Sequence, residues 1–275
     1  MKPKPFHVGV FDSGVGGLTV LKALKAELPC AQFTYLGDMA RLPYGTKSHD
    51  VVVQYSLKAV EMLVSRGVDA VVIACNTASS AAVPAIQARF PTLSVLDVIG
   101  PTVSHAVKQS RAQNFLVLAT ERTVSSGVYT SLIQAQSPLA QVAGIATPLL
   151  VSMAEEGWRE VSITDQILAH YIPKNVMDSK MDTVILGCTH FPFFEKSFRH
   201  FFGGHMNIID SASPTAIALK RQLVSLGELN GMADLEGPYE TRYLVTDSPM
   251  RFLNIASYFL KDKIYPENIE FVHFY

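Results

Sequence analysis

The sequence predicts an α/β protein with two similar, pseudo-symmetric domains, in which mainly parallel sheets are flanked by helices. Short apolar, β-rich runs alternate with longer helix-compatible segments, and this order of strand, crossover and strand favours parallel sheets. The strands are apolar almost throughout, which is typical of sheets covered on both faces. Residues 68–79 (VDAVVIACNTAS) and 181–192 (MDTVILGCTHFP) also match almost position by position, which indicates two related halves.

Each expected strand is a short run of apolar and β-branched residues. Seven such runs are His7–Phe11, Phe33–Leu36, Ala70–Ala74, Ser94–Val98, Phe115–Ala119, Val184–Gly187 and Asn207–Asp210. The segments between them predict helices at Leu18–Glu27, Asp50–Arg66, Ala78–Phe90, Thr102–Gln109, Val124–Ala135 and Pro214–Leu226. After a glycine-rich and acidic surface loop at Gly227–Pro238, we expect strands at Arg242–Val245 and Ile269–Phe274 and a helix near Met250–Phe259.

The composition excludes several classes of protein. At 275 residues and 48% hydrophobic content the chain can build a large core, so we expect neither disorder nor a single small domain. The 23 basic and 24 acidic residues nearly cancel, and no nucleic-acid partner is expected. Three scattered cysteines without a CxxC pair predict neither a disulfide framework nor a structural zinc site. Without a signal-peptide core or a membrane-length apolar run, we expect a soluble cytoplasmic protein that does not bind membranes.

The two matching segments each end a strand on a cysteine that is followed by two polar residues. Asp69 answers Asp182, and Cys75 answers Cys188. Any two buried strands share some similarity, so a chance match is the alternative to a duplication. Ligands of open α/β sheets bind beyond the carboxyl ends of the strands. Two facing halves would therefore present both thiols to one shared cleft.

Two facing thiols suit a proton transfer across a carbon atom. A nucleophilic cysteine needs a base but no second cysteine, and redox pairs usually lie close in sequence. With one thiolate and one thiol on opposite faces of a stereocentre, one removes a proton and the other supplies one, which inverts the centre. A helix N-terminus after the strand would favour the thiolate. The alternative for each cysteine is a small buried hydrophobic residue, which is what we expect of Cys30.

The first loop, VFDSGVGGLTV, runs from a strand through glycines into a helix. These glycines would let backbone N–H groups approach a ligand. Thr19 stands where a dinucleotide-binding fingerprint needs its third glycine, and Asp12 would repel a pyrophosphate. Asp12 would instead suit a substrate ammonium group, orient a thiol, or cap the helix. His190 is an acid/base beside Cys188, a group that stabilises a thiolate electrostatically, or a structural histidine. Ser48 is a candidate helix cap.

Five motifs in order make the chain resemble the glutamate racemases of the aspartate/glutamate racemase superfamily. They are FDSGVGGLTV, GDMARLPYGTKS, IACNTAS, GCTHFP and IIDSASPTA. The resemblance implies two pseudo-symmetric α/β domains with the active site in the cleft between them. It places residues 1–98 and 210–275 in the first domain, which carries Asp12 and Cys75. Residues 99–209 form an inserted second domain, which carries Cys188 and His190.

The resemblance also implies the roles of individual residues. The catalytic set would be Cys75, Cys188, Asp12, His190 and Glu155, with Glu156 as a neighbouring alternative to Glu155. Substrate contacts would come from Asp12, Ser13, Tyr44, Gly45, Asn76, Thr77, Thr189 and His190. The chain departs from the family at Phe191, where tyrosine is common, and at LATERTV (residues 118–124), so Thr120 and Thr123 are not assigned as contacts. No cofactor and no metal are implied.

The implied activity is the interconversion of L- and D-glutamate by two-base proton transfer, which supplies D-glutamate for peptidoglycan. Racemisation of aspartate or another acidic amino acid is the closest alternative. His190 favours glutamate, because aspartate racemases of the superfamily tend to carry glutamate after Cys-Thr. A Rossmann-type oxidoreductase and a non-catalytic two-lobed binding protein are the remaining alternatives. The expected partner is the small-molecule substrate, and a homodimer stays open.

Overall fold

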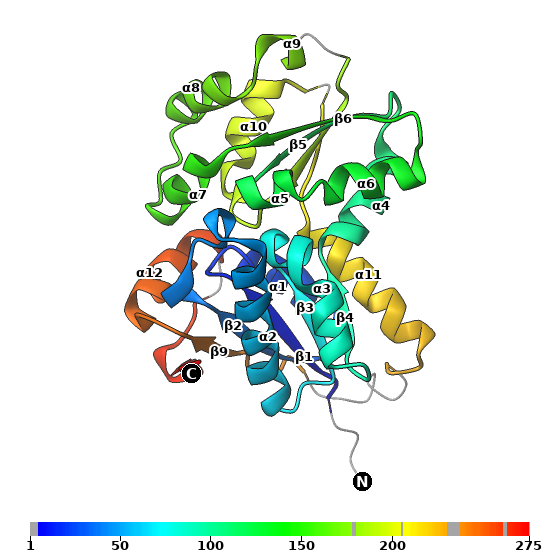
Figure 1. The fold of residues 1–275 in the computed structure, drawn as a ribbon. Coiled ribbons are helices and arrows are strands. Elements are labelled where there is room, and N and C mark those ends of the chain that lie inside the picture. The colour runs from blue at the N-terminus through cyan, green and yellow to red at the C-terminus, as the bar shows by residue number, and fades with distance from the viewer. Residues whose placement is uncertain (1–4, 178–179, 205, 230–236, 261–262, 275) are drawn as a thin grey trace.

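The computed structural model describes residues 5–177, 180–204, 206–229, 237–260 and 263–274. It contains two sheets in which every strand pair is parallel. The first sheet has the order β10-β9-β2-β1-β3-β4 and the second the order β6-β5-β7-β8. Figure 1 shows the second sheet and its helices stacked above the first. The α/β class with parallel sheets flanked by helices is confirmed.

The first sheet combines both ends of the chain. Its strands are β1 (His7–Asp12), β2 (Gln32–Gly37), β3 (Ala70–Ile73), β4 (Ser94–Asp97), β9 (Arg242–Val245) and β10 (Ile269–Phe271). Its helices are α1 (Leu18–Glu27), α2 (His49–Ser65), α3 (Asn76–Arg89), α11 (Ala212–Ser225) and α12 (Pro249–Phe259). Helices α1 and α11 pack together, as do α2 and α3. Strand β1 is buried along its whole length, as expected of a central strand.

The second sheet is built from one continuous part of the chain. Its strands are β5 (Asn114–Ala119), β6 (Gln141–Ala146), β7 (Thr183–Gly187) and β8 (Asn207–Ile209). Its helices are α4 (Ile99–Gln109), α5 (Glu121–Ser125), α6 (Val128–Gln136), α7 (Pro148–Glu155), α8 (Val161–Tyr171), α9 (Lys174–Met177) and α10 (Glu195–Phe202). Helix α4 packs against both α6 and α11, so it bridges the two halves. One hydrophobic cluster, which includes Leu21 of α1 and Ile185 of β7, runs through both.

Most predicted elements lie within two residues of the observed ones. Helix α4 begins three residues earlier than predicted, because the Asp97 carboxylate accepts hydrogen bonds from the N–H groups of Ile99 and Gly100. The single helix predicted over Val124–Ala135 is wrong: the chain breaks into α5 and α6 at Gly127, which has φ 67°. Ser48 caps α2 as predicted, since its Oγ accepts a hydrogen bond from the Val51 N–H. Residues 230–236 of the predicted surface loop lie outside the described part of the chain.

Candidate active site

The two cysteines that end the matched segments lie at the carboxyl ends of strands, one from each sheet. Cys75 follows β3 and is the N-cap of α3, where its Sγ accepts a hydrogen bond from the Ala78 N–H at 3.4 Å. Its thiol donates to Ser13 Oγ at 3.3 Å. Cys188 comes directly after β7. Both are buried and both line the same cavity.

That cavity gathers the residues singled out from the sequence. Ten of them line it: Ser13, Tyr44, Gly45, Cys75, Asn76, Thr77, Glu155, Cys188, Thr189 and His190. Asp12 does not. The cavity holds about 30 Å³, and a single water needs about 10–15 Å³. The walls are therefore nearly closed on one another, and a ligand larger than water must push them apart.

Burial controls the state of the Cys75 thiol. Removal from water, together with the nearby Asp12 carboxylate, raises the pKa of Cys75 to about 12. The hydrogen bonds with Ser13 and the Ala78 N–H act in the opposite direction but are outweighed. Cys75 is consequently a protonated thiol at neutral pH.

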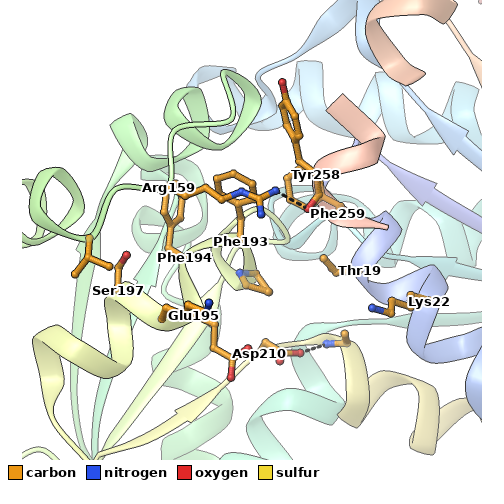
Figure 2. Close-up of a pocket in the computed structure, with 14 residues that line it drawn as sticks. Thr19, Lys22, Arg159, Phe193, Phe194, Glu195, Ser197, Asp210, Tyr258 and Phe259 are labelled. Atoms are coloured by element: carbon orange, nitrogen blue, oxygen red, sulfur yellow. Dashed lines mark hydrogen bonds between the residues drawn. The ribbon is translucent and has the colours of Figure 1, made fainter. Parts of the chain in front are cut away.

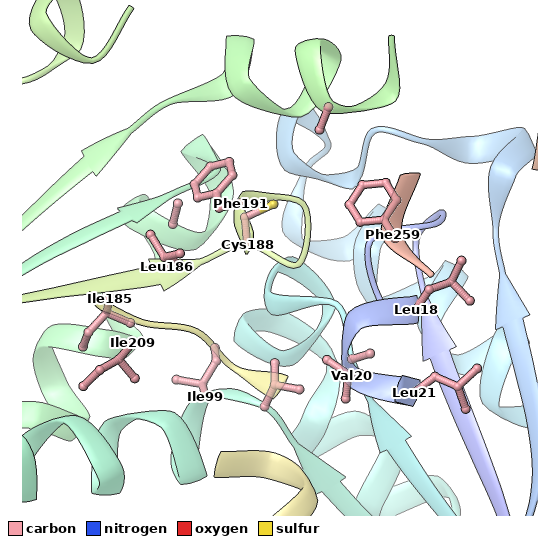
Figure 3. Close-up of a cluster of buried hydrophobic side chains, with 14 of the residues drawn as sticks. Leu18, Val20, Leu21, Ile99, Ile185, Leu186, Cys188, Phe191, Ile209 and Phe259 are labelled. Atoms are coloured by element: carbon pink, nitrogen blue, oxygen red, sulfur yellow. The ribbon is translucent and has the colours of Figure 1, made fainter. Parts of the chain in front are cut away.

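His190 places a positive charge beside the other sulfur. Its Nδ1 lies 3.7 Å from Cys188 Sγ, and its Nε2 lies 3.3 Å from Glu155 Oε1. Burial lowers the pKa of His190, but its contacts with Cys188 and Glu155 outweigh that effect and raise it to about 10. The ring of Phe259 also meets the imidazole edge-on, with centroids 5.8 Å apart. Figure 3 shows Cys188 in the turn after β7 and Phe259 at the end of α12.

Glu155, and not Glu156, belongs to the cavity. Glu155 ends α7, its side chain is 9% exposed, and it makes the contact with His190. Glu156 is exposed. The cavity also contains Val151, which sequence reasoning missed. Val151 and Glu155 are four residues apart on one helix face, and that spacing was the signal available in the sequence.

Asp12 lies behind the cavity wall. Its carboxylate is fully buried and accepts hydrogen bonds from the Gly14 N–H at 2.9 Å and from Thr189 Oγ1 at 3.3 Å. Burial raises its pKa, and the charge of His190 opposes that shift. Asp12 thus ties the first loop to the turn that carries Cys188.

The glycines of the first loop make room for protein atoms. A Cβ on Gly16 would lie 2.5 Å from Thr189 Oγ1 and 2.7 Å from His190 Nδ1. A Cβ on Gly17 would lie 2.5 Å from the Asp12 Cβ. Such distances are far below van der Waals contact. Gly16 therefore allows the loop after β1 to press against the turn after β7, and Gly17 allows the same loop to fold closely onto Asp12 at the end of β1. Both roles differ from the ligand approach expected from the sequence.

Contacts between the two halves close the remaining sides of the cavity. Thr77 at the start of α3 hydrogen-bonds to Thr120, the N-cap of α5, with 2.9 Å between their hydroxyl oxygens. Thr120 lines the cavity, although it was left unassigned because the segment LATERTV departs from the family pattern. Tyr44 turns its hydroxyl away to donate to Asp38 Oδ2 at 2.7 Å. The other lining residues that sequence reasoning missed are Gly14, Leu42 and Pro43.

A larger cavity of about 680 Å³ lies between the turn after β7 and helix α12. Figure 2 shows Arg159, Phe193 and Tyr258 gathered at one side of it. The Arg159 guanidinium lies 4.5 Å from the Phe193 ring centroid and donates to the Tyr258 carbonyl. None of the residues predicted for the site lines this cavity. The larger of the two cavities is therefore not the one that contains the candidate catalytic residues.

Comparison with known proteins assigns the family. The model of the family described as Asp/Glu/Hydantoin racemase matches residues 19–218. The chain belongs to the Asp/Glu/hydantoin racemase family. It is 37% identical to the glutamate racemase of Persephonella marina over 96% of both chains. It is 38% identical to that of Neisseria meningitidis serogroup A over 92% of both.

Solved structures of this racemase family share the whole fold. Glutamate racemase isoform RacE1 from Bacillus anthracis superposes with a TM-score of 0.90 at 31% identity, covering 99% of this chain and 98% of that one. The glutamate racemase of Francisella tularensis in complex with D-glutamate gives 0.89 at 32% identity, covering 100% and 99%. In the described part of this racemase-family chain, no helix is long and apolar enough for a bilayer crossing.

Proposed function

We propose that this protein is a cofactor-independent glutamate racemase, which interconverts L- and D-glutamate by proton transfer between Cα and the sulfurs of Cys75 and Cys188. The observation that carries the proposal is the pair of buried thiols from two sheets in one cavity. The choice of glutamate is supported by relatives named glutamate racemase and by a D-glutamate complex of the same fold.

A two-base reaction requires one sulfur to start as a thiol and the other as a thiolate. Burial keeps Cys75 a thiol, with its pKa raised to about 12. A protonated His190 lies beside Cys188, and positive charge beside a sulfur stabilises a thiolate. In the first direction the Cys188 thiolate takes the Cα proton, the electron pair stays on the substrate as a carbanion, and the Cys75 thiol returns a proton to the opposite face. Cys188 then carries the proton and Cys75 the charge, so the reverse reaction exchanges their roles.

The surrounding residues fall into two proposed groups. Asp12, His190 and Glu155 would assist the cysteines, with Asp12 acting from behind the wall through Thr189. Ser13, Tyr44, Gly45, Asn76, Thr77, Thr189 and His190 would contact the substrate. We keep 1–98 with 210–275, and 99–209, as the proposed domains. The D-glutamate produced would supply peptidoglycan synthesis, as the family resemblance implies.

Cysteine variants in heavy water test this function. L-Glutamate with the purified protein should gain deuterium at Cα and lose optical rotation. Cys75→Ser and Cys188→Ser should each reduce both signals by orders of magnitude, because a serine hydroxyl is a far weaker acid than a thiol. Cys30→Ser is the matched control and should leave them unchanged. Equal activity in all three variants would contradict the proposal, and binding without exchange would favour a two-lobed binding protein. L-Aspartate, run in parallel, tests the alternative substrate.

A further inference from the structure

The side-chain amide of Asn76 is held from one end only. Asn76 is the first residue of α3, is 2% exposed and lines the cavity with the cysteines. Its Oδ1 accepts a hydrogen bond from the Tyr129 hydroxyl at 2.6 Å and one from Ser211 Oγ at 3.5 Å. Its Nδ2 is buried and has no hydrogen-bond partner among the described residues. The amide oxygen therefore has hydrogen-bond partners, and the amide nitrogen has none among the described residues.

The Tyr129 hydroxyl decides which end of the amide is presented to a ligand. Burial raises the pKa of Tyr129 well above its ordinary value, so the phenol keeps its proton and can donate it. An amide has an acceptor oxygen on one side and two N–H donors on the other. With Oδ1 held by two hydroxyls, the N–H groups remain to be satisfied. A buried donor without a partner is destabilising, so an acceptor arriving in the cavity would be bound well.

We propose that Tyr129 is a positioning residue that orients the Asn76 amide so that Nδ2 donates to a carboxylate group of the substrate. Glutamate as the source of that carboxylate rests on the proposed function. A donor-only end selects a carboxylate over an ammonium or amide N–H group, so Tyr129 sets specificity without touching the substrate. Tyr129 belongs to α6, whereas Asn76 follows β3 of the other sheet. The same hydrogen bond therefore joins the two halves across the site.

A double-mutant cycle tests the proposal by calorimetric binding of racemic glutamate. The intact enzyme is suitable, because converting one enantiomer into the other releases no heat. Tyr129→Phe should weaken the Kd about 10-fold, which is the scale of one hydrogen bond to a charged group. Asn76→Ala should weaken it at least as much, and the double variant should match Asn76→Ala alone, because Tyr129 acts through Asn76. Tyr265→Phe, at an exposed tyrosine, is the control and should bind as the wild type does.

A charge substitution at the same position tests the orientation directly. In Asn76→Asp one carboxylate oxygen still accepts from Tyr129 and Ser211, so the fold keeps its hydrogen bonds, while the other oxygen faces the substrate carboxylate. This variant should lose affinity by more than about 100-fold through repulsion and should keep a thermal midpoint near that of the wild type. Wild-type glutamate affinity in Asn76→Asp or in Tyr129→Phe would overturn the proposal. It would also be overturned if Tyr129→Phe weakened glutamate binding as much in the Asn76→Ala background as in the wild type.

Deuterium exchange at Cα on the same samples separates this inference from the proposed function. Wild-type exchange with no coupling between Tyr129 and Asn76 would refute the inference alone. Glutamate binding with the expected coupling but without exchange would refute the racemase activity alone. No glutamate binding by the wild type would overturn both.

Discussion

At the scale of single residues, the site is asymmetric although its two strand ends match. Cys75 is kept as a thiol by burial and by the Asp12 charge, whereas Cys188 faces an imidazolium that Glu155 supports. The asymmetry comes from neighbours that differ between the halves: Cys75 has Ser13 and a helix N–H as partners, and Cys188 has His190. The two matched positions thus have different chemical surroundings.

The raised pKa of His190 predicts how stability depends on pH. The folded protein holds the His190 proton up to about pH 10, above the ordinary value of 6.5. The stability that this proton contributes is complete below pH 6.5 and is lost as pH rises through about 10. Unfolding by urea should therefore show a free energy of unfolding that falls across this window. In His190→Gln the fall should be smaller, and an unchanged pH dependence in that variant would contradict the assignment.

Glu155 and its neighbour provide a matched test of the same charge network. Removing the Glu155 charge withdraws one cause of the raised pKa of His190. Glu155→Gln should therefore shift the alkaline fall of kcat/KM to lower pH. The measurement is Cα exchange between about pH 6 and about pH 10.5. Glu156→Gln changes an exposed carboxylate and should leave the profile unchanged. Identical profiles for the two variants would show that Glu155 does not support His190.

At the scale of elements, the loop after β1 packs against the turn after β7, and the loop after β2 packs against the start of α5, so tightly that glycine is required. Gly16 meets the turn carrying Thr189 and His190, and Gly45 meets Thr120 at the start of α5. These contacts fix how closely the ends of the two sheets approach each other. Close packing of these loops explains the glycines in the site motifs more simply than a phosphate-binding loop would.

Gly45→Ala tests that contact. The added Cβ would lie 2.7 Å from Thr120 Cβ, so the loop and α5 must move apart and the site must widen. We expect kcat/KM to fall about 10–100-fold, because small displacements of reacting groups carry large costs, with little change in thermal midpoint. Gly100→Ala is the control, since its Cβ would meet Asp97 only at 3.7 Å. Equal activity in both variants would contradict a role for close approach.

The sequence predicted the elements whose signal is local and missed those set by context. β1, β3 and β7 are buried apolar runs, and their hydrophobic pattern was sufficient. β6 is a half-exposed edge strand with the sequence QVAGIA, in which alanine and glycine give little β signal. Ten of the eleven predicted site residues line the cavity. The motifs could be placed from sequence because they follow predicted strands, and ligands of open α/β sheets bind beyond the carboxyl ends of the strands. Val151, Thr120 and the hidden place of Asp12 depend on how the two halves meet, which no local pattern encodes.

At the scale of the whole molecule, the candidate active site lies where the two sheets converge. Cys75 belongs to the half formed by both ends of the chain and Cys188 to the half formed by its middle. The cavity of about 30 Å³ is far too small for glutamate, so substrate entry must separate the halves or their loops. In the proposed reaction, the same contacts would exclude water from the carbanion once the site has closed.

The stereochemical course of isotope transfer tests the central claim most directly. Protiated L-glutamate is incubated in heavy water, and both enantiomers are separated and analysed before equilibrium. Two sulfurs on opposite faces predict deuterium at Cα of the D-glutamate formed in the earliest turnovers, while the remaining L-glutamate keeps its protium. Early deuterium in the remaining L-glutamate at the same rate as in the product would mean that one group serves both faces, and the two-base account would be wrong.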